Sequence, residues 1–120
     1  AYVATALAQI NATATGQLAQ LSVSLSQLSI SLSPHHPNYY KSAARAYILL
    51  SEIDPRYLQL AADTLQKAII ISPTDPRLPY NLGIIYKYLN AADSARLQFQ
   101  KSLQLKPNFP DAKAALEISK

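Results

Sequence analysis

Residues 72–107 read SPTDPRLPYNLGIIYKYLNAADSARLQFQKSLQLKP, and this stretch decides the fold. It begins and ends on related phrases, Pro73-Thr74-Asp75-Pro76 and Pro107-Asn108-Phe109-Pro110, which start 34 residues apart. An earlier phrase, Pro34-His35-His36-Pro37, starts 39 residues before the second. A period of this length is typical of stacked helical units, in which each unit buries its apolar face against its neighbours.

Between these proline phrases the apolar residues follow helical spacing. Asp75 and Pro76 predict a helix start, because Asp is a common N-cap and Pro is common at the first helical position. Asn90 predicts the end of that helix, and a second helix continues until Pro107. The apolar positions of the two helices are Leu78, Leu82, Ile85, Tyr86, Leu89, Ala95, Leu97, Phe99, Leu103 and Leu105. The stretch therefore predicts a helix–turn–helix unit.

This unit resembles the tetratricopeptide repeat (TPR). The residues that carry the resemblance, all at the spacing of that family, are Leu82-Gly83, Tyr86, Ala95, Phe99, Ser102 and Pro107. We expect Gly83 and Ala95 to let the two helices approach closely, while Tyr86 and Phe99 fill the gaps beside them. The departures from the family pattern are Pro79 for a bulky residue, Asn90 for the usual turn Gly and Ser102 for Ala.

The neighbouring segments resemble the same repeat more loosely. Residues 37–75 place Ala43-Ala44, Tyr47, Ala61, Leu65 and Ala68 at the family positions, with five extra residues between Leu50 and Tyr57. Within that lengthened turn, Asp54-Pro55 predicts the start of the second helix. Residues 110–120 repeat the start of a unit and predict a capping helix, which repeat arrays need to hide their last apolar face.

The first 36 residues predict a divergent repeat. A heptad-like apolar stripe runs through them, formed by Leu18, Leu21, Leu25, Leu28 and Leu32. The alternation of Ser22 to Ser26 would also suit a strand, but it loses its phase at Gln27, whereas the helical stripe does not. We therefore expect a helix over about 12–32, preceded by a shorter helix over about 2–10 and a turn near Asn11.

Taken together, these patterns predict an all-α fold: a right-handed, TPR-like α-solenoid of about three helical hairpins plus a C-terminal capping helix. The whole chain, 1–120, would form a single domain. Its units would be 1–36, 37–75, 76–109 and the capping helix 110–120. All eleven Lys and Arg and all seven Asp and Glu lie from Lys41 onward, so the first unit has an uncharged surface. Such a surface suggests contact with something, or a polar face that happens to lack ions.

Catalytic and cofactor motifs are absent from the sequence. It contains no GxGxxG, GxxxxGK[ST], HExxH or GxSxG pattern. The chain has no Cys, and its two histidines are neighbours on an expected turn, so no metal site is predicted. The tyrosines are expected to pack between helices and the net charge is only +4, so nucleic acid is not an expected ligand. No apolar run is long enough to predict a membrane span. We expect no enzyme and no cofactor.

The resemblance implies a ligand groove on the concave face, lined by the first helix of each unit. By position the groove residues are Asn38, Lys41, Arg45, Ile48, Arg77, Tyr80, Asn81, Ile84, Lys87 and Tyr88. Four of them are basic and none is acidic, which favours an acidic peptide or an anionic glycan as partner. TPR domains that bind chaperone tails use a carboxylate clamp that Lys41 and Asn81 match. Arg45, Asp111 and Ala115 depart from that clamp, so chaperone-tail binding is not predicted.

A structural function is the alternative to a binding groove. The first unit has no obvious capping helix, so copies could stack head to tail into an extracellular filament as a homo-oligomer. Asn11-Ala12-Thr13 is an N-glycosylation sequon, so Asn11 is a candidate glycan carrier. Residues Ser31 to Tyr47 also resemble C-terminal TPR regions of bacterial O-antigen-ligase-like membrane proteins. These features favour an extracytoplasmic or cell-surface location, as a processed piece of a longer protein.

Overall fold

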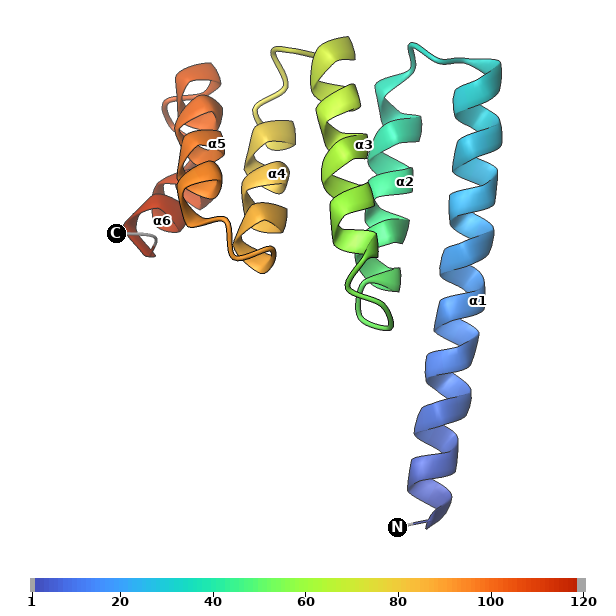
Figure 1. The fold of residues 1–120 in the computed structure, drawn as a ribbon. Coiled ribbons are helices and arrows are strands. Elements are labelled where there is room, and N and C mark those ends of the chain that lie inside the picture. Colours follow the sequence, from blue (N-terminus) through green and yellow to red (C-terminus); the bar gives the residue numbers. More distant parts are fainter. Residues whose placement is uncertain (1, 119–120) are drawn as a thin grey trace.

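The computed structural model describes residues 2–118, and their side chains from Ala14 onward. The helices are α1 (Tyr2–Leu32), α2 (Pro37–Leu50), α3 (Tyr57–Ile71), α4 (Arg77–Tyr88), α5 (Ala92–Leu105) and α6 (Pro110–Ile118), and the described residues contain no strand. Each helix packs against the next along the chain, and α1 extends well beyond the others (Figure 1). The predicted all-α fold of stacked helical hairpins is confirmed. None of the helices within residues 2–118 has the length and hydropathy needed to cross a bilayer.

Helices α2 and α3 form one hairpin, and α4 and α5 form the other. The turn between α2 and α3 is the lengthened one that the sequence predicted. Asp54 closes it, because its carboxylate accepts hydrogen bonds from the Arg56 backbone N–H at 3.1 Å and from the Arg56 guanidinium. Ile53 of the same turn lies over Gly16, where an added Cβ would stand 2.9 Å from the Ile53 Cδ1 atom. The extra residues therefore form a contact with α1.

Both predicted boundaries of α4 have a clear local cause. Asp75 accepts a hydrogen bond from the Arg77 backbone N–H at 3.0 Å, although the helix begins at Arg77 rather than at Pro76. At the other end, Asn90 has φ 61°, a left-handed conformation that Asn tolerates better than most residues. The Ala91 N–H then donates to the Tyr86 carbonyl at 2.9 Å, which completes a Schellman-type end. Asn90 thus replaces the turn Gly of the family.

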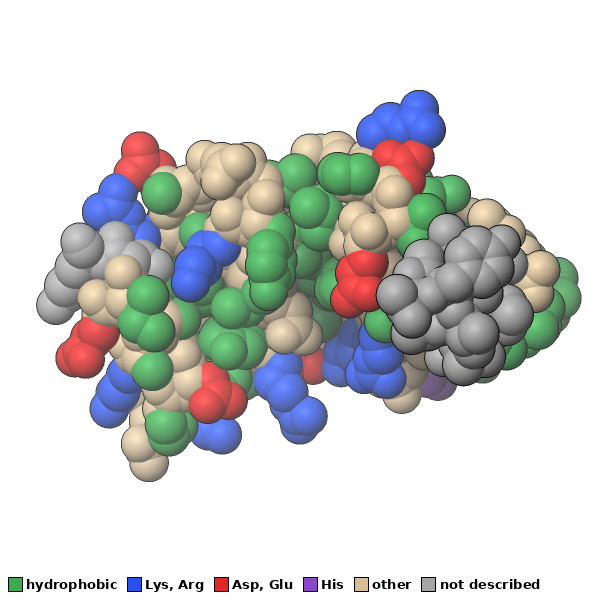
Figure 2. Space-filling view, turned by 90° about the horizontal axis from the view of Figure 1, so that it is seen from below, with side chains coloured by type: hydrophobic (Ala, Val, Ile, Leu, Met, Phe, Trp, Pro, Cys, Tyr) green, Lys and Arg blue, Asp and Glu red, His purple; other side chains and the backbone are tan. Residues whose placement is uncertain are grey.

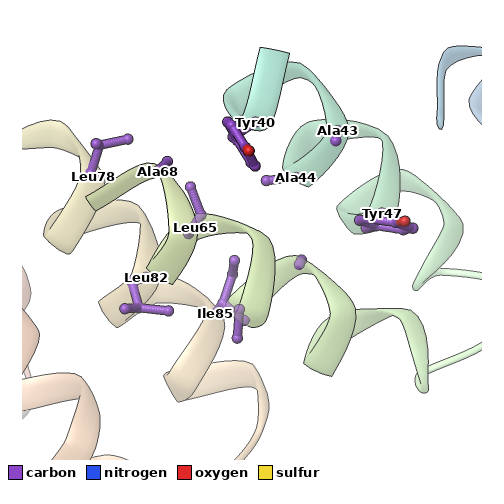
Figure 3. Close-up of a cluster of buried hydrophobic side chains, with 11 residues drawn as sticks. Tyr40, Ala43, Ala44, Tyr47, Leu65, Ala68, Leu78, Leu82 and Ile85 are labelled. Atoms are coloured by element: carbon purple, nitrogen blue, oxygen red, sulfur yellow. The ribbon is translucent and has the colours of Figure 1, made fainter. Parts of the chain in front are cut away.

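The main core lies between α2, α3 and α4. Figure 3 shows its side chains pointing toward one another from the three helices: Tyr40, Ala43, Ala44 and Tyr47 from α2, Leu65 and Ala68 from α3, and Leu78, Leu82 and Ile85 from α4. The alanines let the helix axes approach, and the larger side chains fill the space left beside them.

The predicted packing within the second hairpin is confirmed. Phe99 is fully buried against Gly83, where an added Cβ would lie 2.6 Å from the ring. Ala95 is also fully buried, and Tyr86 is half-buried with its hydroxyl accepting a hydrogen bond from Gln66. Ser102 replaces the usual Ala without cost, because its buried hydroxyl donates to the Pro76 carbonyl at 2.7 Å.

The first unit differs from the prediction, because it contains one helix rather than a hairpin. The expected turn near Asn11 is wrong: the backbone is helical from Tyr2 to Leu32. No Pro interrupts this segment, and a single Asn or Gly costs a helix interior only about 1 kcal/mol or less, which is too little to end the helix. The Gln27 side chain donates to the Tyr47 hydroxyl at 3.0 Å, as Gln66 does to Tyr86 one unit later. Therefore α1 occupies the place of the second helix of a repeat.

Helix α6 has the character of a cap. Its Lys113 and Glu117 stand 34 residues after Pro79 and Gly83, which are buried under α5. Both charged side chains are exposed instead. The last helix therefore presents a charged outer face where the preceding unit presents an apolar one.

Candidate binding groove

A groove of about 340 Å³ runs between α2 and α4, with α3 contributing to its floor. Its lining contains six of the residues predicted from the sequence: Lys41, Arg45, Ile48, Arg77, Asn81 and Ile84. Ala44, Leu65 and Leu78 complete the wall. Because α2 and α4 are the first helices of successive units, equivalent turns of the two helices face the groove from either side. The repeat geometry thus brings together residues that are more than thirty positions apart in the chain.

The other predicted groove residues lie outside this lining. Asn38 is exposed in the first turn of α2, and Lys87 and Tyr88 are exposed in the last turn of α4. Tyr80 is half-buried, with its ring centroid 5.9 Å from that of Phe99 and 5.3 Å from that of Phe109. Its packing fixes α6 against the second hairpin. The side chain of Asn11, the candidate glycan carrier, lies outside the described residues, so its modification stays a prediction.

The groove is less basic than the sequence predicted, because an acidic residue lies beside it. The Lys41 ammonium is 2.7 Å from the Asp75 carboxylate, and both residues are partly buried. Sequence reasoning treated Asp75 only as the cap of α4, and the structure shows that it has both roles. The expectation of four cations without a carboxylate is therefore wrong for the folded groove. The missed signal was spacing, since Lys41 and Asp75 are one repeat length apart.

The two arginines supply the available positive charge of the groove. Arg45 and Arg77 are exposed, and neither side chain is within ion-pairing distance of a carboxylate in the described part of the chain. In the space-filling view, Lys and Arg side chains are spread along the lower edge of the molecule (Figure 2). An arginine guanidinium pairs with a carboxylate through two parallel hydrogen bonds. The groove can therefore bind carboxylates while Ile48 and Ile84 contact apolar side chains.

The described residues around the groove form no metal-binding cluster. Within residues 2–118 no group of three or more His, Asp or Glu side chains is close enough to hold a metal ion. Beside the groove, the Asp75 carboxyl has a lowered pKa. Partial burial raises the pKa of its carboxyl, but hydrogen bonds from Lys41 and from the Arg77 backbone outweigh burial and lower it overall.

Replacing Asp75 by Asn should remove a pH-dependent part of the stability. A lowered folded-state pKa stabilises the protein above the ordinary pKa of Asp, about 3.9, and this stabilisation is lost as the pH falls through the lowered value. Asn also caps helices well, so the variant should lose about 1 kcal/mol at neutral pH through the lost ion pair. Urea unfolding at pH 7 and below pH 3 measures this. An equal loss at both pH values would contradict the assignment.

Comparison with solved structures identifies the fold. The TPR domain of Arabidopsis OM64 superposes with a TM-score of 0.74 and 24% identity, covering 92% of this chain and 87% of that one. The first TPR of Spaghetti (RPAP3), bound to the HSP90 peptide SRMEEVD, gives 0.72 and 15%, covering 90% and 89%. PcrH, in complex with the chaperone-binding region of PopD, gives 0.68 and 13%, covering 99% and 87%.

These likenesses show that the chain has the TPR fold, as its sequence predicted. No protein-family model and no curated protein matches the sequence. The weaker resemblance to O-antigen-ligase-like proteins stays a prediction.

Proposed function

We propose that this chain is a noncatalytic interaction module that binds an extended, acidic protein segment in the groove between α2 and α4. The observation that carries the proposal is the pair of exposed arginines, Arg45 and Arg77, on opposite walls of one groove with apolar side chains between them. Two guanidinium groups in one groove favour carboxylates, and the apolar wall favours a peptide over a fully polar ligand.

The structural neighbours support a peptide as the occupant. RPAP3 is bound to an HSP90 peptide and PcrH to a region of PopD, so the same fold accommodates protein segments. An acidic segment would meet the exposed arginines first, and the Lys41–Asp75 pair would lie beside its path. Because Lys41 is already paired with Asp75, it contributes less to binding than its sequence position suggested.

The test measures binding of a fluorescein-labelled peptide rich in Glu and Leu, by fluorescence anisotropy at low salt, where surface charges are least screened. We expect the double variant Arg45→Glu, Arg77→Glu to lower the affinity by a factor on the order of ten or more. The matched control is Lys67→Glu, Lys101→Glu, which makes the same charge change on exposed residues of α3 and α5. Unchanged affinity in the groove variant, or an equal loss in both variants, would reject the groove.

The second candidate function is the head-to-tail filament. The observation that favours it is the leucine-rich, uncharged face of α1 at the N-terminal end of the array. It requires that face to join the charged outer face of α6 in another copy. Filaments in electron micrographs of the concentrated protein would support this candidate, and a monomer or a closed dimer would reject it. An extracellular location and a glycan on Asn11 belong to the same proposal. If the protein isolated from its native source had the intact mass of the unmodified chain, the glycan would be excluded.

A further inference from the structure

Helix α1 has two different faces. One face packs toward α2 and is built mainly from small residues, namely Gly16, Ala19, Val23, Ser26 and Ile30. The other face carries what we call the leucine stripe: Leu18, Leu21, Leu25, Leu28 and Leu32, each between 56% and 76% exposed. None of these leucines belongs to the described cores. The stripe that the sequence singled out is therefore turned away from the rest of the molecule.

The leucine stripe is more regular than the apolar residues that occur singly on protein surfaces. Its members are separated by three, four, three and four residues, the spacing that places side chains along one seam of a two-helix coiled coil. Single exposed leucines are ordinary, but a contiguous apolar stripe about 21 Å long marks a contact surface. In Figure 2, hydrophobic side chains form the right-hand edge of the molecule, behind the large group of grey atoms.

We propose that two copies of this chain pair through the leucine stripe, α1 against α1, around a two-fold axis. The stripe is self-complementary, because the same leucine spacing on both copies lets each leucine fit between leucines of the partner. Residues 1–40 carry no Lys, Arg, Asp or Glu, so two copies meet without charge repulsion. At roughly 100 Å² for each leucine, the pair buries about 1,000 Å², which reaches the lower limit of a specific interface.

Other occupants fit the stripe less well. The C-terminal end of another copy presents Lys113 and Glu117, which would lose their solvation against leucines. An anionic membrane surface selects helices with Lys or Arg beside the apolar face, and α1 has neither. The leucine stripe of a second copy matches the first stripe in polarity, length and spacing. The pairing is independent of the peptide groove, which lies between α2 and α4.

The test is sedimentation equilibrium over a range of concentrations, with the triple variant Leu21→Gln, Leu25→Gln, Leu28→Gln. We expect the wild-type mass to rise from 13.1 kDa to twice that value, and the variant to dimerise at least tenfold more weakly. Gln is a good helix former and these positions are exposed, so circular dichroism should show an intact fold. The matched control replaces three exposed apolar residues elsewhere, Ile70→Gln, Leu97→Gln, Ile118→Gln, and should dimerise as the wild type does.

Cross-linking gives a second, direct readout. The chain has no Cys, so Leu25→Cys places one thiol at the centre of the stripe and should form a disulfide-linked dimer on oxidation. Leu97→Cys on α5 leaves the stripe intact, but its thiol lies outside the pairing surface, so it should form no disulfide-linked dimer under the same conditions. A wild-type monomer at every concentration, open filaments, or equal dimerisation of the stripe variant would overturn the proposal. Binding of a monomer to phosphatidylcholine–phosphatidylserine vesicles, lost in the stripe variant, would assign the stripe to a lipid surface and overturn it equally.

Discussion

Replacing Phe99 by Ala is expected to lower the free energy of unfolding by about 3–5 kcal/mol, the largest effect of any single substitution considered for this chain. Phe99 is fully buried and fills the gap that Gly83 leaves between α4 and α5. Its ring also packs at 5.9 Å from Tyr80, which in turn contacts Phe109. Removing the ring therefore opens a cavity that a neighbouring Gly cannot fill, and it loosens the attachment of α6.

Urea unfolding followed by circular dichroism measures this loss. The matched control is Leu97→Ala, two positions away on the same helix, whose side chain is half exposed. We expect the control to lose less than about 1 kcal/mol, because little apolar area leaves the core. Similar losses for Phe99→Ala and Leu97→Ala would mean that Phe99 is not the centre of the second hairpin.

The two glycines of the chain should respond in opposite ways to replacement by Ala. Gly83→Ala is expected to cost about 1–3 kcal/mol, because the new Cβ would lie 2.6 Å from a ring confined on all sides. Gly16→Ala should stabilise by about 0.5 kcal/mol, because Ala favours a helix interior and the only close atom is the end of the Ile53 side chain, which can rotate away. Neither glycine has a positive φ, so backbone strain does not enter the comparison.

A double variant tests whether steric crowding against Phe99 causes the loss of stability in Gly83→Ala. If the ring of Phe99 is what opposes Ala at position 83, then Gly83→Ala combined with Phe99→Leu should lose less stability than the sum of the two single losses. Additive losses would show that the close contact between these two positions is not the source of the cost. Thermal or urea unfolding of the four proteins in the cycle provides the numbers.

The hairpin of α4 and α5 could be predicted almost completely from its sequence. Asp75 and Asn90 act within two or three residues of their own positions, through hydrogen bonds that the local backbone provides. Gly83 and Phe99 are complementary in size, because the Phe99 ring fills the space that the missing side chain of Gly83 leaves. Six of the predicted groove residues line one cavity, because a repeat carries the geometry of one unit over to the next, while their role in binding stays a prediction.

The first helix and the charge of the groove could not be predicted in the same way. The stop expected near Asn11 rested on one residue, and a single Asn costs a helix interior too little free energy to end it. Lys41 appeared free in the sequence, yet it meets a carboxylate that the stacking of two units brings to it. Tyr80 appeared to be a groove residue, yet it packs between Phe99 of α5 and Phe109 of the turn before α6.

The amino-acid sequence by itself determined the two helices of the α4–α5 hairpin, their ends and their pairing, since caps and helical spacing act between residues close along the chain. Only the tertiary structure decided which face of α1 is buried and which cation of the groove is neutralised. Both depend on surfaces from distant segments: the small residues of α1 allow close approach to α2 and leave the leucine stripe outside. The stacking of the units decides which side chains meet across a repeat boundary. The residues next to each side chain in the sequence do not encode these contacts.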